Sequence, residues 1–232
     1  MKQDSSKLSN RRRFLTGMGV VATTATLATA ARAAENHNHD EHHGFTPARH
    51  PEDSWMGDMP GVHRAFIDSS TGPGGVGAVN FATNILSAHG QGYGGSDSDY
   101  GMIVCFRHDS SPFGFNNAMW EKYGELFSSR TGVYHSETNA PLTVNPLNLE
   151  QSPYGNRSNT TEKLANRGVH FAICNLSTGG MAGMLARSTG GSRDDIYQEL
   201  ISNSVANGRF VPAGVVAATR AQEYGYSLLY SA

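Results

Sequence analysis

This chain of 232 residues has few cysteines, a small net charge and no long apolar run. Its two cysteines exclude a small scaffold that is held together by several disulfides. No apolar run reaches the ~18 residues that a membrane-spanning helix needs, so we expect no stable membrane span. The formal net charge is −2, and without an excess of basic residues the chain has no general attraction for phosphate backbones. Nucleic acid is therefore not an expected partner.

The first 33 residues contain, in order, the parts of an export signal. Arg11-Arg12-Arg13-Phe14-Leu15 is a twin-arginine motif, a weakly apolar Ala- and Thr-rich stretch follows, and Ala31-Arg32-Ala33 is a small-x-small cleavage site. A basic disordered tail would not explain this order. Residues 1–33 are therefore predicted to be a twin-arginine signal peptide, which the twin-arginine translocase reads. The predicted location is the periplasm or the extracellular space. Cleavage after Ala33 would leave 12 basic and 19 acidic residues.

Residues 34–60 are polar, rich in histidine and punctuated by proline, which is typical of a flexible linker. Four histidines lie close together here: His37, His39, His42 and His43. Imidazole binds transition metals, so we expect adventitious metal binding by these histidines. A flexible segment offers no fixed geometry for specific metal chemistry, and no cofactor is predicted.

From residue 61 onward, continuous apolar runs alternate with helical periodicity. The expected strands are 62–68, 102–106, 169–174, 209–212 and 226–230, and the expected helices are 76–90, 116–127, 160–166, 179–187, 194–205 and 215–224. Residues 61–232 are therefore predicted to form one α/β domain with a mostly parallel five-stranded sheet, covered by helices on both faces. Residues 128–158 lack periodicity and are expected to be an inserted loop, either a lid or binding loop or a disordered insertion.

Ligands of open parallel sheets bind beyond the carboxyl ends of the strands, so the residues after each strand are the ones to consider. Gly72-Pro73-Gly74-Gly75-Val76-Gly77 follows the first strand and matches the G-x-G-x-x-G pattern of dinucleotide sites. Such sites also carry an acidic residue ~20 residues further on. Asp109 comes 32 residues after Gly77, which favours a simple tight turn over a dinucleotide site.

Cys174 ends the predicted strand 169–174, just ahead of a helix expected to start near Gly179. A helix N-terminus favours the thiolate, so Cys174 is a candidate nucleophile. The candidate anion donors are the backbone amides of Ser177, Thr178, Gly179 and Gly180. The alternative is that Cys174 packs as a small hydrophobic residue.

Two other residues bear on this hypothesis. Cys105 lies inside its apolar strand, where packing is the favoured interpretation. A Cys105–Cys174 disulfide is the alternative if the two strands are neighbours. His108 follows the second strand and is a candidate acid or base near neutral pH. A solvent-facing loop histidine is the alternative.

Several motifs of residues 62–232 resemble those of the DsrE/DsrF-like sulfur-relay family. The first is Arg167-Gly168-Val169-His170-Phe171-Ala172-Ile173-Cys174-Asn175, followed by Val211-Pro212-Ala213-Gly214-Val215 and Gln222-Glu223-Tyr224-Gly225-Tyr226. His108-Asp109 and Asn116-Asn117 are also similar to members of that family.

The resemblance implies a three-layer α/β/α sandwich that assembles into homo-oligomers. It also implies that Cys174 matches the cysteine that carries a persulfide between relay partners. The leading hypothesis is thus an exported DsrE-like protein in which Cys174, with His108 as proton carrier, handles sulfane sulfur or redox equivalents. The alternative is a non-catalytic periplasmic module that binds a small ligand or a metal.

Overall fold

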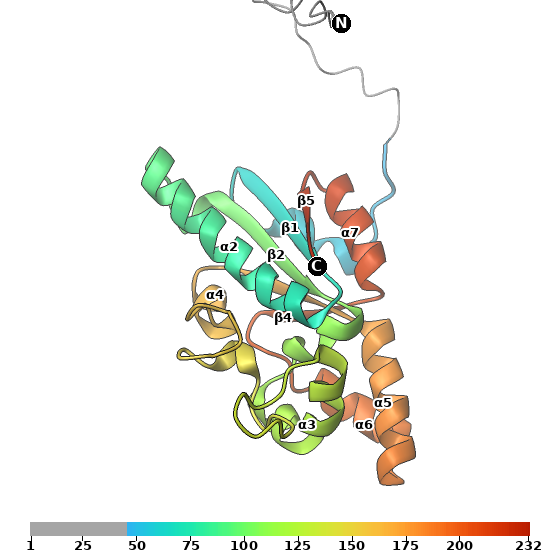
Figure 1. Cartoon of the computed structure of the whole chain (residues 1–232). Helices are drawn as coiled ribbons and strands as arrows, with labels where there is room; N and C mark the ends of the chain where they lie inside the picture. The colour runs from blue at the N-terminus through green and yellow to red at the C-terminus, as the bar shows by residue number, and fades with distance from the viewer. Residues whose placement is uncertain (1–45) are drawn as a thin grey trace, which may run out of the picture. The chain divides into compact units, whose positions relative to one another are not determined.

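The sheet has five strands and all of them are parallel (Figure 1). The computed structural model describes residues 46–232, and its compact unit runs from Pro47 to Ala232. The strands are β1 (His63–Ser69), β2 (Tyr100–Phe106), β3 (His170–Cys174), β4 (Gly208–Val211) and β5 (Ser227–Ser231). Their order across the sheet is β4-β3-β2-β1-β5. The predicted three-layer α/β/α arrangement is confirmed.

Helices cover the two faces of the sheet unequally. The larger core joins the sheet to α2 (Gly72–Tyr93), α3 (Asn117–Thr131), α4 (Thr161–Asn166), α5 (Asn175–Thr189) and α6 (Arg193–Ile201). The smaller core lies under α1 (Trp55–Asp58) and α7 (Gly214–Glu223), on the opposite face. Figure 1 shows α2 and α7 on the two sides of the sheet. Short 3₁₀ turns complete the domain at Pro51–Asp53, Asp97–Asp99, His108–Gly114 and Pro146–Asn148.

Alternating side chains of each strand enter different cores, which explains the continuous apolar runs. In β2, Val104 and Phe106 belong to the α2 face, whereas Ile103 and Cys105 belong to the α7 face, and all four are fully buried. A strand that is buried on both faces needs apolar residues at every position. This requirement made the central strands predictable to within a few residues.

The prediction that residues 34–60 form a flexible linker is wrong for residues 47–60. Residues 47–60 belong to the compact unit, and Met56 and Met59 pack into the smaller core. Tyr226 Oη donates a hydrogen bond of 2.8 Å to the carbonyl of Met56. The physical reason is that α7 alone does not cover its face of the sheet, so this short segment completes it.

The insertion 128–158 packs on the domain, which argues against the disordered alternative, while its role as a lid or binding loop stays a prediction. Its first four residues continue α3 to Thr131, and Leu142 and Leu147 are buried. Asn145 is fully buried and donates hydrogen bonds of 2.9 and 2.8 Å to the carbonyls of Phe113 and Phe115. One amide side chain thus ties the loop to the turn after β2.

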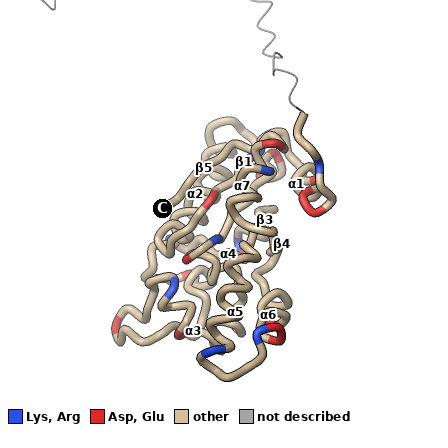
Figure 2. Tube along the Cα trace, turned by 90° about the vertical axis from the view of Figure 1, so that its right-hand side faces the viewer, with Lys and Arg blue, Asp and Glu red and all other residues tan. Residues whose placement is uncertain are grey.

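Within residues 46–232, no helix is both long and apolar enough to cross a bilayer. Figure 2 shows the lysine and arginine positions scattered over this side of the domain rather than gathered in one patch. The expectation that nucleic acid is not a partner stays a prediction.

Candidate functional site

The carboxyl ends of the strands bring the sequence-predicted residues to one edge of the domain. β1 ends at Ser69, β2 at Phe106 and β3 at Cys174. Three helices also start at this edge: α2, α5 and α7 each begin within three residues of the end of a strand. Their N-terminal amides therefore point toward the region where a ligand of a parallel sheet binds.

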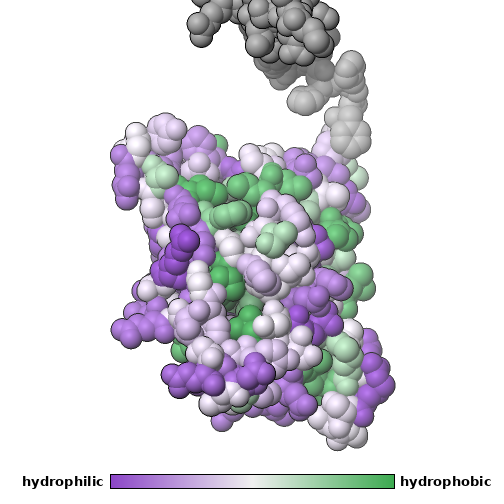
Figure 3. Space-filling model, viewed as in Figure 1, coloured by the Kyte–Doolittle hydropathy of each residue, from purple (hydrophilic) through white to green (hydrophobic). Residues whose placement is uncertain are grey.

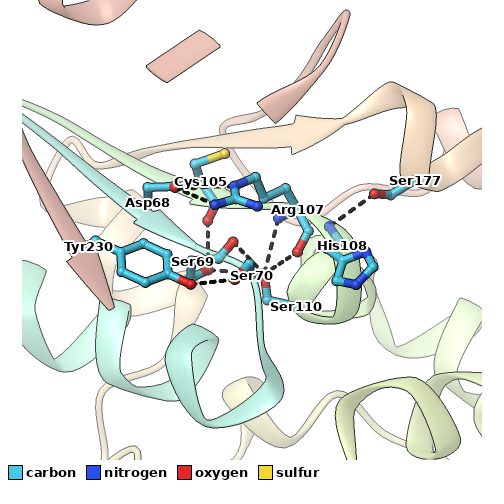
Figure 4. Close-up of polar contacts among 9 residues, drawn as sticks. All are labelled: Asp68, Ser69, Ser70, Cys105, Arg107, His108, Ser110, Ser177 and Tyr230. Atoms are coloured by element: carbon cyan, nitrogen blue, oxygen red, sulfur yellow. Dashed lines mark hydrogen bonds and ion pairs between the residues drawn. The ribbon is translucent and has the colours of Figure 1, made fainter. Parts of the chain in front are cut away.

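A partly buried ion pair joins β1 to the residue that follows β2 at this edge (Figure 4). Arg107 Nε lies 2.9 Å from Asp68 Oδ1, and Arg107 Nη2 lies 2.9 Å from Asp68 Oδ2. The hydrogen bond that the Arg107 guanidinium donates to the Asp68 carboxylate is the main reason that the pKa of this guanidinium is raised. The register sets Asp68 beside Cys105, and Arg107 comes two residues later on the same face. Sequence analysis gave neither charged residue a role.

The Arg107 side chain is enclosed on two further sides. Its guanidinium carbon lies 5.9 Å from the centre of the Tyr230 ring, at the end of β5. Gly214, the first residue of α7, packs so closely that an added Cβ would lie 2.6 Å from Arg107 Cβ. The pair therefore links β1, β2, β5 and the start of α7 into one rigid assembly.

Serine hydroxyls hold the turn that leaves β2. Ser69 Oγ donates a hydrogen bond of 2.7 Å to the Cys105 carbonyl, and Ser110 Oγ accepts one of 3.0 Å from the Arg107 amide. Ser70 Oγ lies 2.6 Å from Tyr230 Oη, so a hydrogen bond also joins β5 to this turn. These short polar side chains satisfy backbone groups that the strands leave unpaired.

His108 occupies a strained position between β2 and α5. Its φ of +53° lies in the left-handed region, which histidine enters more readily than most residues. The His108 amide donates a hydrogen bond of 2.9 Å to Ser177 Oγ in the first turn of α5. The imidazole is 69% exposed, with Nε2 3.5 Å from Asp109 Oδ2, and Arg130 binds the other oxygen of that carboxylate at 2.8 Å. The structure thus brings two predicted site residues, His108 and Ser177, into contact.

Cys174 is the last residue of β3 and the N-cap of α5. It is 5% exposed, and Thr178 Oγ1 donates a hydrogen bond of 3.0 Å to its carbonyl oxygen. Among residues 46–232, no side chain caps this end of α5. Within the described chain, no hydrogen bond joins the Cys174 thiol to the His108 ring, so their cooperation stays a prediction.

The predicted anion donors shift along the chain because α5 begins at Asn175 rather than near Gly179. The amides of Thr178, Gly179 and Gly180 lie beyond the third helical residue, where they donate within the helix. The unused amides are those of Asn175, Leu176 and Ser177. Of the four predicted donors, Ser177 alone has a backbone amide without a partner inside the helix.

Cys105 is a packing residue, as its place in the strand predicted. It is fully buried, and burial, reinforced by the Asp68 charge, raises the pKa of its thiol well above the ordinary value. Both cysteines are free thiols. β2 and β3 are neighbours, but Cys105 pairs with Ala172, two residues before Cys174. A strand spacing of about 4.8 Å and a rise of about 3.3 Å per residue put the two Cα atoms about 8 Å apart, which is too far for a disulfide without backbone movement.

The glycine motif after β1 serves packing. A Cβ at Gly72 would fall on the carbonyl oxygen of Thr131, one at Gly74 on that of Ser231, and one at Gly75 against the Phe113 ring. The N-terminus of α2 is therefore covered by protein atoms, and Thr71 caps it by accepting a hydrogen bond from the Gly74 amide. This supports the tight-turn interpretation over a pyrophosphate site.

A cavity of about 400 Å³ lies between the start of α2 and the insertion. Its lining includes Pro73 and Val76 of α2 and Val133, Tyr134 and Tyr154 of the insertion. Burial raises the pKa of the Tyr154 hydroxyl. Sequence reasoning expected the insertion to be a lid or binding loop but identified none of these residues. The two tyrosines of the loop, Tyr134 and Tyr154, were the available signal.

The predictions for the N-terminal region fall outside the described residues. They are the signal peptide 1–33, with its cleavage site, and the metal-binding histidines His37, His39, His42 and His43. Among residues 46–232, no group of three or more His, Cys, Asp or Glu side chains is arranged to hold a metal ion.

Comparisons of the whole chain with protein-family models, with curated proteins and with solved structures gave no match. The similarity to the DsrE/DsrF-like family therefore stays a prediction that depends on the motifs alone.

Proposed function

We propose that this chain is a thiol protein that handles sulfane sulfur or redox equivalents through Cys174. One observation carries the proposal: Cys174 is the N-cap of a 15-residue helix whose first amides have no side-chain cap. A sulfur anion at that position is stabilised by the free amides and by the helix dipole. Cys105 offers no such environment, because it is fully buried and its pKa is raised.

The proposed step transfers one sulfur atom. The Cys174 thiolate attacks the outer sulfur of a persulfide or polysulfide donor, the S–S bond of the donor breaks, and the rest of the donor leaves as a thiolate or as a shorter polysulfide anion. When the transferred sulfur carries a proton, His108 accepts it, and Cys174 is left with a persulfide anion at the start of α5. His108 is the proposed proton carrier, since it is exposed and tied to the same helical turn by Ser177. The Asp109 carboxylate lies beside the imidazole, with Oδ2 3.5 Å from His108 Nε2.

The proposal includes the predicted export route. A twin-arginine signal peptide at residues 1–33 would deliver the folded protein to the periplasm or the extracellular space through the twin-arginine translocase. The DsrE-like motifs support sulfur as the cargo, because they include Cys174 and His108.

The test measures thiol reactivity of the purified mature protein across pH by intact mass after alkylation. We expect labelling of Cys174 and no labelling of Cys105. Cys174→Ser should abolish the label and Cys105→Ser should keep it. Incubation with inorganic polysulfide should then add the mass of one sulfur atom to the wild type and to Cys105→Ser. A native protein whose Cys174 resists label at every pH would overturn the proposal.

A second candidate function is non-catalytic binding of a small neutral molecule, and the cavity beside Tyr134 and Tyr154 favours it. Its lining combines aromatic and aliphatic side chains with Thr131 and Ser136, and none of the lining residues that the structure describes is charged. Indole is a suitable probe because it matches this lining in polarity. Binding of indole that is lost in Tyr154→Ser and kept in Cys174→Ser would support this function. If Tyr154→Ser and Cys174→Ser bind indole with the same affinity, this function is contradicted.

A further inference from the structure

One edge of the sheet is left open for pairing. β5 pairs with β1 on one side and is the last strand on the other, so half of its backbone N–H and C=O groups point outward. Among residues 46–232, no backbone or side-chain hydrogen bond reaches those outward groups. Figure 1 shows β5 between α2 and α7, with neither helix lying across it.

The opposite edge is protected, which makes the contrast informative. β4 has only four residues and carries Arg209, whose guanidinium carbon lies 5.3 Å from the centre of the Trp55 ring. Pro212 follows directly. Short length, a charge and a proline are the usual devices that prevent edge-to-edge association. The sequence of β5 (Ser227–Ser231) contains no charged residue and no proline.

The surroundings of β5 are apolar on both faces. Leu228 and Tyr230 point toward the α7 face and are 44% and 54% exposed. On the other face, Phe81 is 40% exposed and lies one helical turn beyond Gly77, which packs against Ser231. Figure 3 shows the corresponding hydrophobic surface between α2 and α7. Such exposure along a free strand is typical of an interface.

The strand is complementary to itself. If two copies of β5 pair antiparallel about Leu229, Leu228 of each copy faces Tyr230 of the other on the α7 face, and Ser227 faces Ser231. Aromatic–aliphatic pairs stabilise neighbouring strands, and the absence of charge removes like-charge repulsion at the two-fold axis. A two-fold contact of this kind closes after two copies and leaves only the two protected β4 edges.

We propose that two copies of this chain form a homodimer through antiparallel pairing of their β5 strands, which extends the two sheets into one of ten strands. The pairing runs the two sheets in opposite directions, so the two carboxyl edges lie at opposite ends of the dimer. Each site is then built from one copy alone. This inference does not depend on the proposed thiol function.

The test is the mass in solution of the full mature chain, measured by sedimentation over a range of concentrations. We expect a dimer whose dissociation constant rises roughly tenfold or more in Leu228→Lys, since two apolar pairs are lost in each dimer. Leu176→Lys is the matched control. Leu176 is 73% exposed on α5, away from β5, and its variant should dimerise like the wild type.

Hydrogen exchange on the wild-type protein gives a second measurement that does not depend on the folding of a variant. The outward amides of β5 should be protected at high protein concentration and exchange faster on dilution. A monomer at every concentration, a trimer, or a dimer that Leu228→Lys leaves unchanged would overturn the proposal, as would concentration-independent exchange in β5.

Discussion

Removal of the Asp68 carboxylate is the sharpest test of how the carboxyl edge is built. Asp68→Ala leaves the Arg107 guanidinium without its bidentate partner, in a place where α7 and Tyr230 prevent it from turning freely to solvent. The charge is thus left partly desolvated and unpaired. The expected result is a marked loss of stability of the whole domain.

The magnitude follows from the burial of the two side chains. Asp68 is 9% exposed and Arg107 is 22% exposed. Loss of one partner of a fully buried pair costs about 3–5 kcal/mol. The partial exposure of Arg107 lowers the expected cost to about 2–3 kcal/mol. For a domain of this size, that loss corresponds to a Tm lower by about 5–10 °C.

A double-mutant cycle separates the interaction from the cost of each truncation. Urea unfolding of Asp68→Ala, Arg107→Ala and the double variant should give a coupling energy of at least about 1.5 kcal/mol. Asp68→Asn keeps an acceptor without the charge and should be intermediate. Strictly additive single variants would refute the reasoning, because they would mean that the pair contributes nothing beyond its separate side chains.

Three further predictions concern other parts of the domain. Burial lowers the pKa of His170 in the folded protein. The wild type should therefore lose stability as the pH falls from about 6.5, the ordinary pKa of histidine, through the lower pKa of the folded state, by at most ~1.4 kcal/mol per pH unit. His170→Gln should lose less stability over this range, and urea midpoints measured at several pH values would show the difference. Gly72→Ala should destabilise the domain by more than about 3 kcal/mol, because the added Cβ falls on a backbone carbonyl. Gly180→Ala is the matched control in α5, where the added Cβ meets open space, and it should stabilise the domain by up to ~1 kcal/mol. Melting curves of the two variants would compare them. Asn145→Ala should cost about 2–3 kcal/mol and expose the insertion to limited proteolysis, since two buried carbonyls lose their donors.

Most of the fold could be predicted because the signals are local. The run Met102–Phe106 is apolar at every position, so its burial on both faces did not depend on knowing the neighbouring strands. The segment 47–60 was missed for the opposite reason. Its prolines and polar residues resemble a linker, and only the uncovered face of the sheet makes Met56 and Met59 core residues.

The site was predictable in part. Position at the end of a strand was enough to single out Cys174 and His108, since parallel strands bring their carboxyl ends together. The Asp68–Arg107 pair was missed because it depends on the register of β1 against β2, which sequence periodicity does not give. One signal was available: opposite charges stand at the ends of two apolar runs.

The carboxyl edge has two parts with different tasks. Around Asp68, Arg107 and Tyr230 the polar groups are paired with one another, so this part holds the strands together. At the start of α5, the amides beside Cys174 are free, so this part can receive an anion. The division predicts that Asp68→Ala lowers stability without changing the rate at which Cys174 is alkylated under native conditions.

Ser177→Ala tests the other part. Loss of the hydroxyl frees the His108 amide and should change the pH profile of Cys174 alkylation, with less than about 1 kcal/mol of destabilisation, because one hydrogen bond at a partly exposed site is lost. A Ser177→Thr variant keeps the acceptor and should restore the profile. If Asp68→Ala and Ser177→Ala instead shift stability and thiol reactivity together, the edge acts as a single unit, and the helix N-terminus is not what sets the chemistry of Cys174.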